Sequence, residues 1–156
     1  MQAEQWYWQK TWSSFRSGGQ EIVLAWEGGT ARIDLYDEGV PRTAAAFLAR
    51  LPIELPMVHV AWSGDMLMGA EPMPLLVKEE ENRTRLVRPG DLAYDPKHDE
   101  ITLTYGTAEA RLPSGPNTLT VIGCIQEGLD AFAQWARARR FQGLGVVRFS
   151  PAAPRD

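Results

Sequence analysis

The stretch MVHVAWSGDM, residues 57–66, carries the side chains with the clearest capacity for chemistry. A histidine can transfer a proton near neutral pH, so His59 is a candidate for proton exchange with a ligand, and so is the carboxylate of Asp65. Ser63 lies in Trp-Ser-Gly-Asp, which lacks the first glycine of the G-x-S-x-G nucleophile motif. The strand-to-helix elbow that would expose such a serine is not expected there either. We therefore interpret Ser63 as a turn residue.

Aromatic and polar residues elsewhere in the chain could join this stretch in one binding pocket. Aromatic walls with a few polar groups are the usual composition of a small-molecule site. Arg111 could hold a ligand carboxylate through two parallel hydrogen bonds. The candidate ligand-binding residues are His59, Trp62, Asp65, Tyr94, Tyr105, Arg111 and Asn117. The sequence assigns a catalytic role to none of them.

Each candidate also has a purely structural interpretation. His59 could be a core histidine bonded to backbone, and Arg111 could lie on a solvated rim. The aromatic candidates could be plain core residues, since large aromatic side chains dominate protein interiors. Only the convergence of several candidates would make a site, and convergence depends on the fold.

Metal and thiol chemistry are not expected. The two histidines, His59 and His98, are far apart in the sequence, and neither belongs to a cluster with the spacing of zinc ligands. Cys124 is the single cysteine, so an internal disulfide is excluded. Burial between Ile122 and Ile125 would raise the pKa of its thiol and make it unreactive. We predict no metal and no cofactor.

The composition indicates one soluble domain. The chain has 156 residues, of which 44% are hydrophobic and 23% charged, enough for a packed core. Its net charge of −4 argues against nucleic acid and anionic membranes as partners, because both require a concentrated basic face. No apolar run approaches the roughly 20 residues that span a bilayer. The first residues, MQAEQWYWQK, lack the pattern of a secretory signal, so we expect a cytoplasmic protein.

The candidate residues must be positioned by strands and helices, and most of the predicted elements are strands. Helices are predicted at PRTAAAFLARLP, which starts with a proline, and at LDAFAQWA. About eight short strands are predicted, at EIVLAW, TARIDLY, MVHVAW, DMLMGA, DLAY, EITLTYG, LTVIGCI and GVVRF. Regular helices do not separate the strands, so a parallel sheet is not expected. The pattern favours a mainly β fold with two helices, a closed antiparallel barrel of about eight strands.

The chain divides into three predicted parts. Residues 1–20 form an arm rich in aromatic residues, residues 21–150 form the barrel domain, and residues 151–156 form a tail. Disordered tails are poor in aromatic residues. We therefore expect the arm to pack across the domain or to contact a second subunit in a homo-oligomer. The aromatic residues of the arm are Trp6, Tyr7, Trp8, Trp12 and Phe15.

Three segments, in this order, resemble the cyclophilin superfamily. PRTAAAFLARLP is similar to the cyclophilin segment that contains P-x-T-xx-NF. Val58-His59 followed by Gly64-Asp65 resembles the cyclophilin F-H-R and Q-G-G-D. VIGCIQEGLDAF resembles V-F-G-x-V-x-E-G-x-x-x-V. A closer resemblance, over about residues 21–149, is to a bacterial family of uncharacterised cyclophilin-like proteins known only as a domain of unknown function. PRTAAAFLARLP, VHVAWSG, PGDLAYDP, LTYG and IQEGLDAF carry it.

The resemblance implies a cyclophilin-like barrel but not proline isomerase activity. In cyclophilins the arginine after the histidine polarises the substrate amide and lowers a rotation barrier of roughly 18–20 kcal/mol. Val60 stands at that position and has no donor to offer. We therefore predict a protein that binds a small polar or carboxylate-bearing metabolite, and leave open whether it transforms it. The alternatives are a degenerate isomerase-like peptide binder and a subunit that docks a partner through the N-terminal arm.

Overall fold

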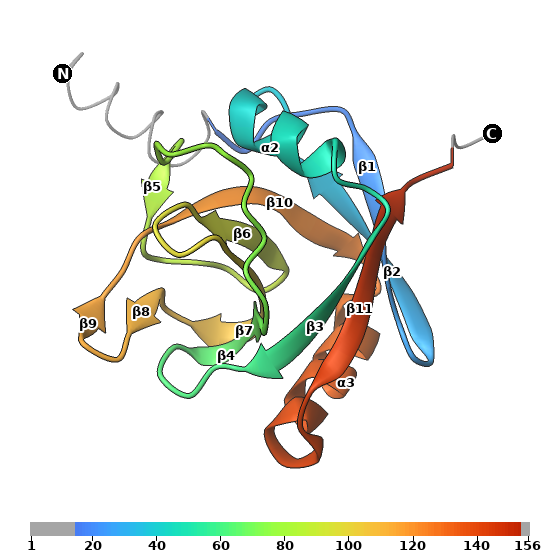
Figure 1. Ribbon diagram of the computed structural model, residues 1–156. Helices are drawn as coiled ribbons and strands as arrows, with labels where there is room; N and C mark the ends of the chain where they lie inside the picture. Colours follow the sequence, from blue (N-terminus) through green and yellow to red (C-terminus); the bar gives the residue numbers. More distant parts are fainter. Residues whose placement is uncertain (1–14, 154–156) are drawn as a thin grey trace, which may run out of the picture.

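The computed structural model describes residues 15–153, which form a mainly β fold with two helices (Figure 1). The first half contains β1 (Glu21–Trp26), β2 (Gly29–Leu35), α2 (Pro41–Leu48), β3 (Ile53–His59), β4 (Gly64–Gly69) and β5 (Arg83–Thr84). The second half contains β6 (Asp91–Asp95), β7 (Glu100–Ala108), β8 (Arg111–Leu112), β9 (Gly115–Pro116), β10 (Leu119–Glu127), α3 (Leu129–Gln142) and β11 (Gly145–Pro151).

Eight antiparallel strands close into a barrel, which confirms the predicted fold. Their order is β2–β1–β11–β3–β4–β7–β6–β10, and β10 pairs back to β2 to complete the circle. The short β5 pairs with the start of β10. β10 has a neighbour on both sides, because Ile125 pairs with Ile33 of β2 and Val121 pairs with Ala93 of β6. Val121 and Ile122, which point to opposite faces of β10, are both fully buried, so both faces of this strand are covered.

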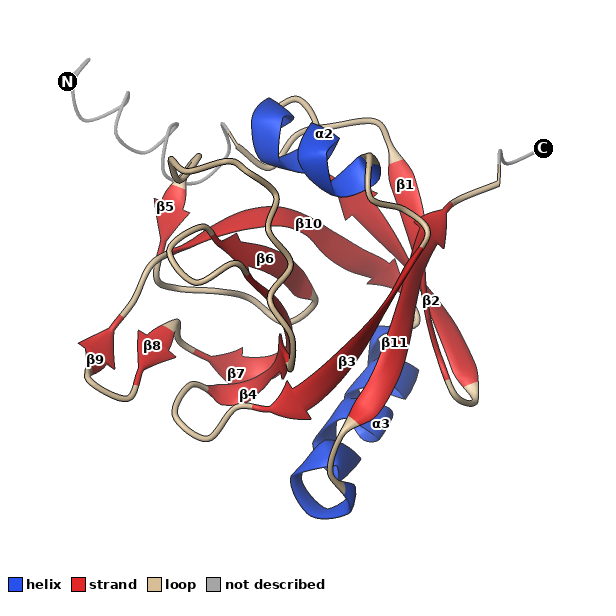
Figure 2. Cartoon of the chain, viewed as in Figure 1, coloured by secondary structure: helices blue, strands red, loops and turns tan. Residues whose placement is uncertain are grey.

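The two helices lie at opposite ends of the molecule (Figure 2). α2 begins at Pro41, as predicted, and Phe47 packs edge-to-face on Phe149 of β11 with ring centroids 5.2 Å apart. α3 packs through Phe132, whose ring centroid lies 5.3 Å from that of Trp26. Neither helix of the described chain is long and apolar enough to cross a membrane.

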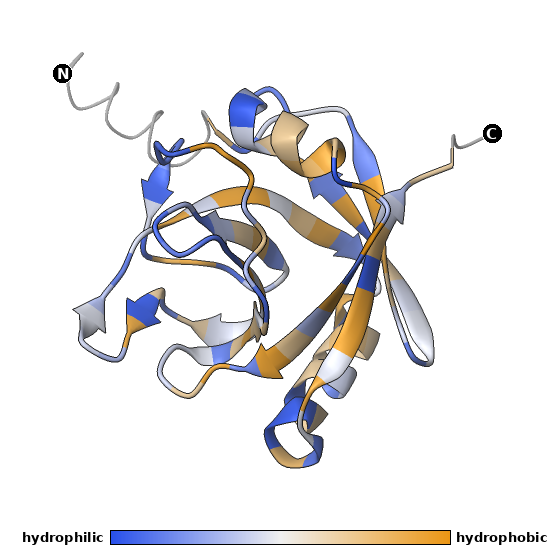
Figure 3. Ribbon diagram, in the orientation of Figure 1, coloured by the Kyte–Doolittle hydropathy of each residue, from blue (hydrophilic) through white to orange (hydrophobic). Residues whose placement is uncertain are grey.

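Two connecting segments cover the outside of β6 and β7. The segment 70–90 contains only the two-residue β5, and its Met73 and Val87 are buried. The stretch LPSGPNT contains part of a small hairpin, β8–β9. β7 is consequently buried on both faces, including Thr102 and Thr104. β5 is hydrophilic, in contrast to the long apolar stretches of β10 and β11 (Figure 3).

The end of the predicted arm lies against the barrel. Phe15 is buried and packs edge-to-face on Tyr36 at 6.3 Å. Arg16 binds Asp91 of β6 through two hydrogen bonds. The aromatic residues on which the arm prediction mainly rests, Trp6, Tyr7, Trp8 and Trp12, lie outside the described residues.

Candidate functional site

A pocket of about 600 Å³ lies between the end of β3 and the end of α3. Val58 and Ala61 form one apolar wall, and Phe141 and Leu144 form the other. Three polar side chains reach it, those of His59, Arg139 and Arg140. The pocket forms here because the last turn of α3 and the following Gly143 pass beside the end of β3, where the chain turns toward β4.

His59 is held at both ring nitrogens. Its Nδ1 lies 2.7 Å from the carbonyl oxygen of Val60, which can only accept, so Nδ1 carries the hydrogen. Nε2 is then unprotonated and accepts a hydrogen bond from the Tyr105 hydroxyl at 2.7 Å. Burial lowers the pKa of His59, which keeps the ring neutral at pH 7. In this arrangement neither nitrogen is free to take a proton from a ligand.

Arg140 of α3 completes a hydrogen-bonded chain with these two residues. Its Nε donates to the Tyr105 oxygen at 3.4 Å, and its Nη2 lies 3.0 Å from Asp65 Oδ1. Asp65 is fixed in turn, because its Oδ2 accepts the backbone N–H of Thr107 at 3.1 Å. These hydrogen bonds link the Arg140 guanidinium through the Tyr105 hydroxyl to the His59 imidazole and fix one side of the pocket.

The structure brings together three of the seven predicted site residues, His59, Asp65 and Tyr105. Trp62 is 38% exposed and does not line the pocket. Arg111 is exposed on β8, where its carbonyl oxygen accepts a hydrogen bond from the Ser63 hydroxyl at 3.3 Å.

Tyr94 and Asn117 lie elsewhere, because β7 separates them from the pocket. Tyr94 pairs with Ile101, near the start of β7, whereas Tyr105 lies near its end. Four residues of strand between Ile101 and Tyr105 correspond to about 13 Å. The seven candidate residues thus do not all lie together, because the strand register places Tyr94 and Asn117 in a second cluster.

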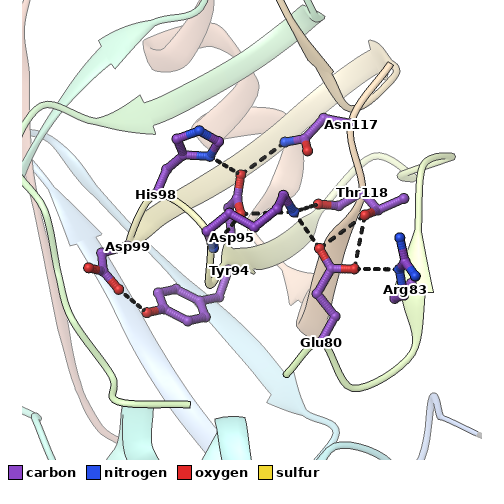
Figure 4. Close-up of polar contacts among 9 residues, drawn as sticks. Glu80, Arg83, Tyr94, Asp95, His98, Asp99, Asn117 and Thr118 are labelled. Carbon is purple, nitrogen blue, oxygen red and sulfur yellow. Dashed lines mark hydrogen bonds and ion pairs between the residues drawn. The ribbon is translucent and has the colours of Figure 1, made fainter. Parts of the chain in front are cut away.

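The second cluster surrounds the buried carboxylate of Asp95 (Figure 4). Its Oδ2 accepts from His98 Nδ1 at 2.8 Å and from Asn117 Nδ2 at 2.9 Å. Burial favours the neutral acid, but hydrogen bonds from Asn117, His98 and Lys97 outweigh it and lower the pKa of Asp95.

Tyr94 packs beside this cluster with a fully committed hydroxyl. It donates to Asp99 Oδ1 at 2.7 Å and accepts the backbone N–H of Leu75 at 3.2 Å. Burial, together with the hydrogen bond and the charge of Asp99, raises the pKa of Tyr94 to about 12. Tyr94 therefore anchors the covering segment, in keeping with its structural interpretation as a core residue.

Sequence reasoning missed Arg140 as a pocket residue. Arg139 and Arg140 both lie in the last turn of α3. One signal was available, since a helical stripe with Phe132 and Ala136 also contains position 140, four residues further on. Within residues 15–153, no three His, Cys, Asp or Glu side chains lie close enough together to hold a metal ion.

The family model described as "Protein of unknown function (DUF3830)" matches residues 22–151, so the chain belongs to this family. A search of curated proteins finds no relative of the chain.

Solved structures with similar folds confirm the cyclophilin-like barrel. The structure of McbB in complex with tryptophan matches with a TM-score of 0.69 and 21% identity, over 86% of this chain and 46% of McbB. This chain thus spans just under half the length of McbB. A hypothetical protein from Archaeoglobus fulgidus matches with a TM-score of 0.58 and 23% identity, over 88% of this chain and 98% of that one.

A cyclophilin-type peptidyl-prolyl cis-trans isomerase from Cryptosporidium parvum, studied in the presence of the dipeptide Ala-Pro, matches with a TM-score of 0.64. It is 12% identical, over 86% of this chain and its own full length. Identities this low establish the shared fold and leave the activity to be argued from the residues of the site.

Proposed function

We propose that this member of the DUF3830 family binds a small molecule carrying a carboxylate and an apolar group in the pocket between β3 and α3. One observation carries the proposal: two guanidinium groups, of Arg139 and Arg140, stand beside apolar walls in a hollow of about 600 Å³. Pockets for small ligands typically measure roughly 300–1,000 Å³ and combine apolar walls with a few polar groups.

The charge of the pocket supports an anionic group. Arg140 is paired with Asp65, but Arg139 has no carboxylate partner among the described residues. Instead Arg139 donates to the carbonyl oxygens of Trp135 and Gly143. The bond to Gly143 satisfies one carbonyl group just after the end of α3, where exposed carbonyl oxygens disfavour an anion. A positive charge therefore remains at the pocket.

The same geometry supports binding more than catalysis. Both nitrogens of His59 are committed, to the Val60 carbonyl and to Tyr105, and Val60 replaces the cyclophilin arginine. A ligand would meet a neutral ring and fixed cations. Tryptophan, the molecule named in the McbB complex, unites a carboxylate with an apolar ring, which makes it a suitable first probe.

A peptide ligand is the second candidate, because one side of the pocket is open. Phe141 is 86% exposed and Leu144 is 53% exposed. Exposed apolar side chains at the rim of a groove are typical of surfaces that receive a partner chain. The expected cytoplasmic location, the lack of nucleic acid and membrane partners, and oligomerisation through the N-terminal arm remain predictions.

A thermal-shift screen with amino acids and small monocarboxylates tests the proposal, with tryptophan and tryptophan amide as a matched pair. A bound ligand raises the melting temperature, because it stabilises only the folded state. Arg139→Gln should weaken carboxylate binding about 10- to 100-fold, the effect of losing a charged hydrogen bond of roughly 1.5–3 kcal/mol.

Arg137→Gln is the control, since Arg137 is an exposed arginine of the same helix that does not line the pocket. The carboxylate proposal is wrong if tryptophan amide binds as well as tryptophan, if no carboxylate binds, or if both variants weaken binding equally. Binding of proline-containing peptides in the absence of carboxylate binding would favour the second candidate.

A further inference from the structure

We infer that the chain carries a second, separate ligand site, which binds an oxyanion such as phosphate between β5 and the β9–β10 connection. A hollow of about 380 Å³ lies there. Arg83 and Arg85 approach it from the covering segment, Asn117 and Thr118 line it from the side of β10, and Lys97 is also at its wall. None of these residues lines the pocket beside His59.

The two arginines reach the hollow from β5 and from the residue just beyond its end. Arg83 belongs to β5, Arg85 follows two positions later, and both line the hollow. The backbone is held on both sides of this segment. Arg83 lies opposite Thr120 of β10, and the carbonyl oxygen of Arg85 accepts the N–H of Ala110 at 2.8 Å.

Each guanidinium is anchored through one nitrogen and leaves others available. Arg83 Nε lies 2.9 Å from Glu80, and Arg85 Nε lies 3.1 Å from Glu109. Glu80 is 8% exposed whereas Arg83 is 73% exposed, so the carboxylate stands behind the cation and the guanidinium faces solvent. Within residues 15–153 the terminal nitrogens of Arg83 and Arg85 have no recorded hydrogen-bond partner.

Buried polar groups hold this arrangement rigidly (Figure 4). The ammonium group of Lys97 contacts Glu80, Asp95 and the carbonyl oxygen of Thr118. These three contacts use all three of its hydrogens. Asn117 is 9% exposed and gives one of its two amide hydrogens to Asp95. The second hydrogen of Asn117 remains for a ligand.

These donors suit an oxyanion better than a halide. Guanidinium groups bind phosphate and sulfate through paired, parallel N–H groups, a geometry that a spherical ion cannot use. At Arg83 the guanidinium lies outermost and the Glu80 carboxylate behind it, so an anion meets the N–H groups first there. Free phosphate and a small phosphomonoester present the same chemistry, and the experiment below distinguishes them.

Titration of the ¹⁵N-labelled chain tests the inference, with inorganic phosphate, glycerol phosphate, sulfate and chloride at constant ionic strength. Phosphate or glycerol phosphate should shift the amide signals of residues 83–85 and 117–118 saturably, and the tighter of the two identifies the source. Arg83→Gln and Arg85→Gln should each weaken binding by about tenfold or more. Arg83→Lys, which keeps the charge but loses the planar fork, should lose part of the affinity.

Arg148→Gln is the control, because this exposed arginine lies on β11, across the barrel from β10. Arg83 is mostly exposed, so its variants should fold, and the dispersion of their spectra verifies this. The inference fails if chloride produces the same shifts, if Arg148→Gln weakens binding as much as Arg83→Gln, or if phosphate produces no saturable shift.

Discussion

The ion pair between Arg16 and Asp91 should contribute more to stability than any exposed pair of the described chain. The Asp91 side chain is 0% exposed and that of Arg16 is 12% exposed. Two parallel hydrogen bonds of 3.1 Å join them, and Arg16 also donates to the Tyr36 hydroxyl at 3.2 Å. The backbone N–H of Arg88 gives the carboxylate a further hydrogen bond, of 2.8 Å.

Arg16→Ala removes the cation and leaves the carboxylate buried. Breaking one partner of a buried pair typically costs about 3–5 kcal/mol. The Arg88 N–H remains, so we expect a loss near the lower end, about 3 kcal/mol of the free energy of unfolding. Arg16→Ala combined with Asp91→Asn should recover part of this loss, because the neutral amide oxygen can still accept from Arg88.

Urea unfolding followed by tryptophan fluorescence measures these differences, provided that the slope of the transition is unchanged. Arg148→Ala is the control, since its pair with Glu54 is long, at 3.9 Å, and exposed. Such a pair contributes about 0–1 kcal/mol. A loss for Arg16→Ala no larger than that of Arg148→Ala would refute the reasoning.

Two further predictions concern ionisation. Because the pKa of Asp95 is lowered from its ordinary value of 3.8, its contribution to stability is complete above that pH and is lost as the pH falls through the folded-state pKa. Acid unfolding of Asp95→Asn should accordingly be shallower than that of the wild type, and equal slopes would contradict this. Burial raises the pKa of Cys124 to about 11, so native Cys124 should react with a thiol reagent at pH 8 about 100-fold more slowly than in urea. Equal rates in the two states would disprove it.

The fold was predictable from the sequence because its local patterns agree with one another. Alternating strands, the proline that starts α2 and the apolar stripe of α3 each survive in the structure. Those patterns depend on neighbours along the chain, for which spacing is informative.

The site was only partly predictable, because it depends on contacts between distant residues. Tyr105 of β7 lies close to His59 of β3 because β4 pairs with both strands. Tyr94 lies away from them, because it pairs with Ile101 near the start of β7. Arg140 reaches the pocket from a helix that begins after all the strands that carry the predicted site residues. The periodicity of hydrophobic residues and the composition do not determine which turn of a helix packs against the end of which strand.

The two histidines show that the residue type alone does not determine which ring nitrogens are free to exchange a proton. His59, in the position that resembles the cyclophilin catalytic histidine, has both nitrogens committed inside the fold. His98 received no role from the sequence, yet only its Nδ1 is bound, to a buried carboxylate that accepts and so places the hydrogen on that nitrogen. Its side chain is 47% exposed, and among the described residues Nε2 has no recorded partner. A general base needs a free, oriented nitrogen. The environment of His59 provides none, so the pocket beside His59 is better suited to hold a ligand than to deprotonate it.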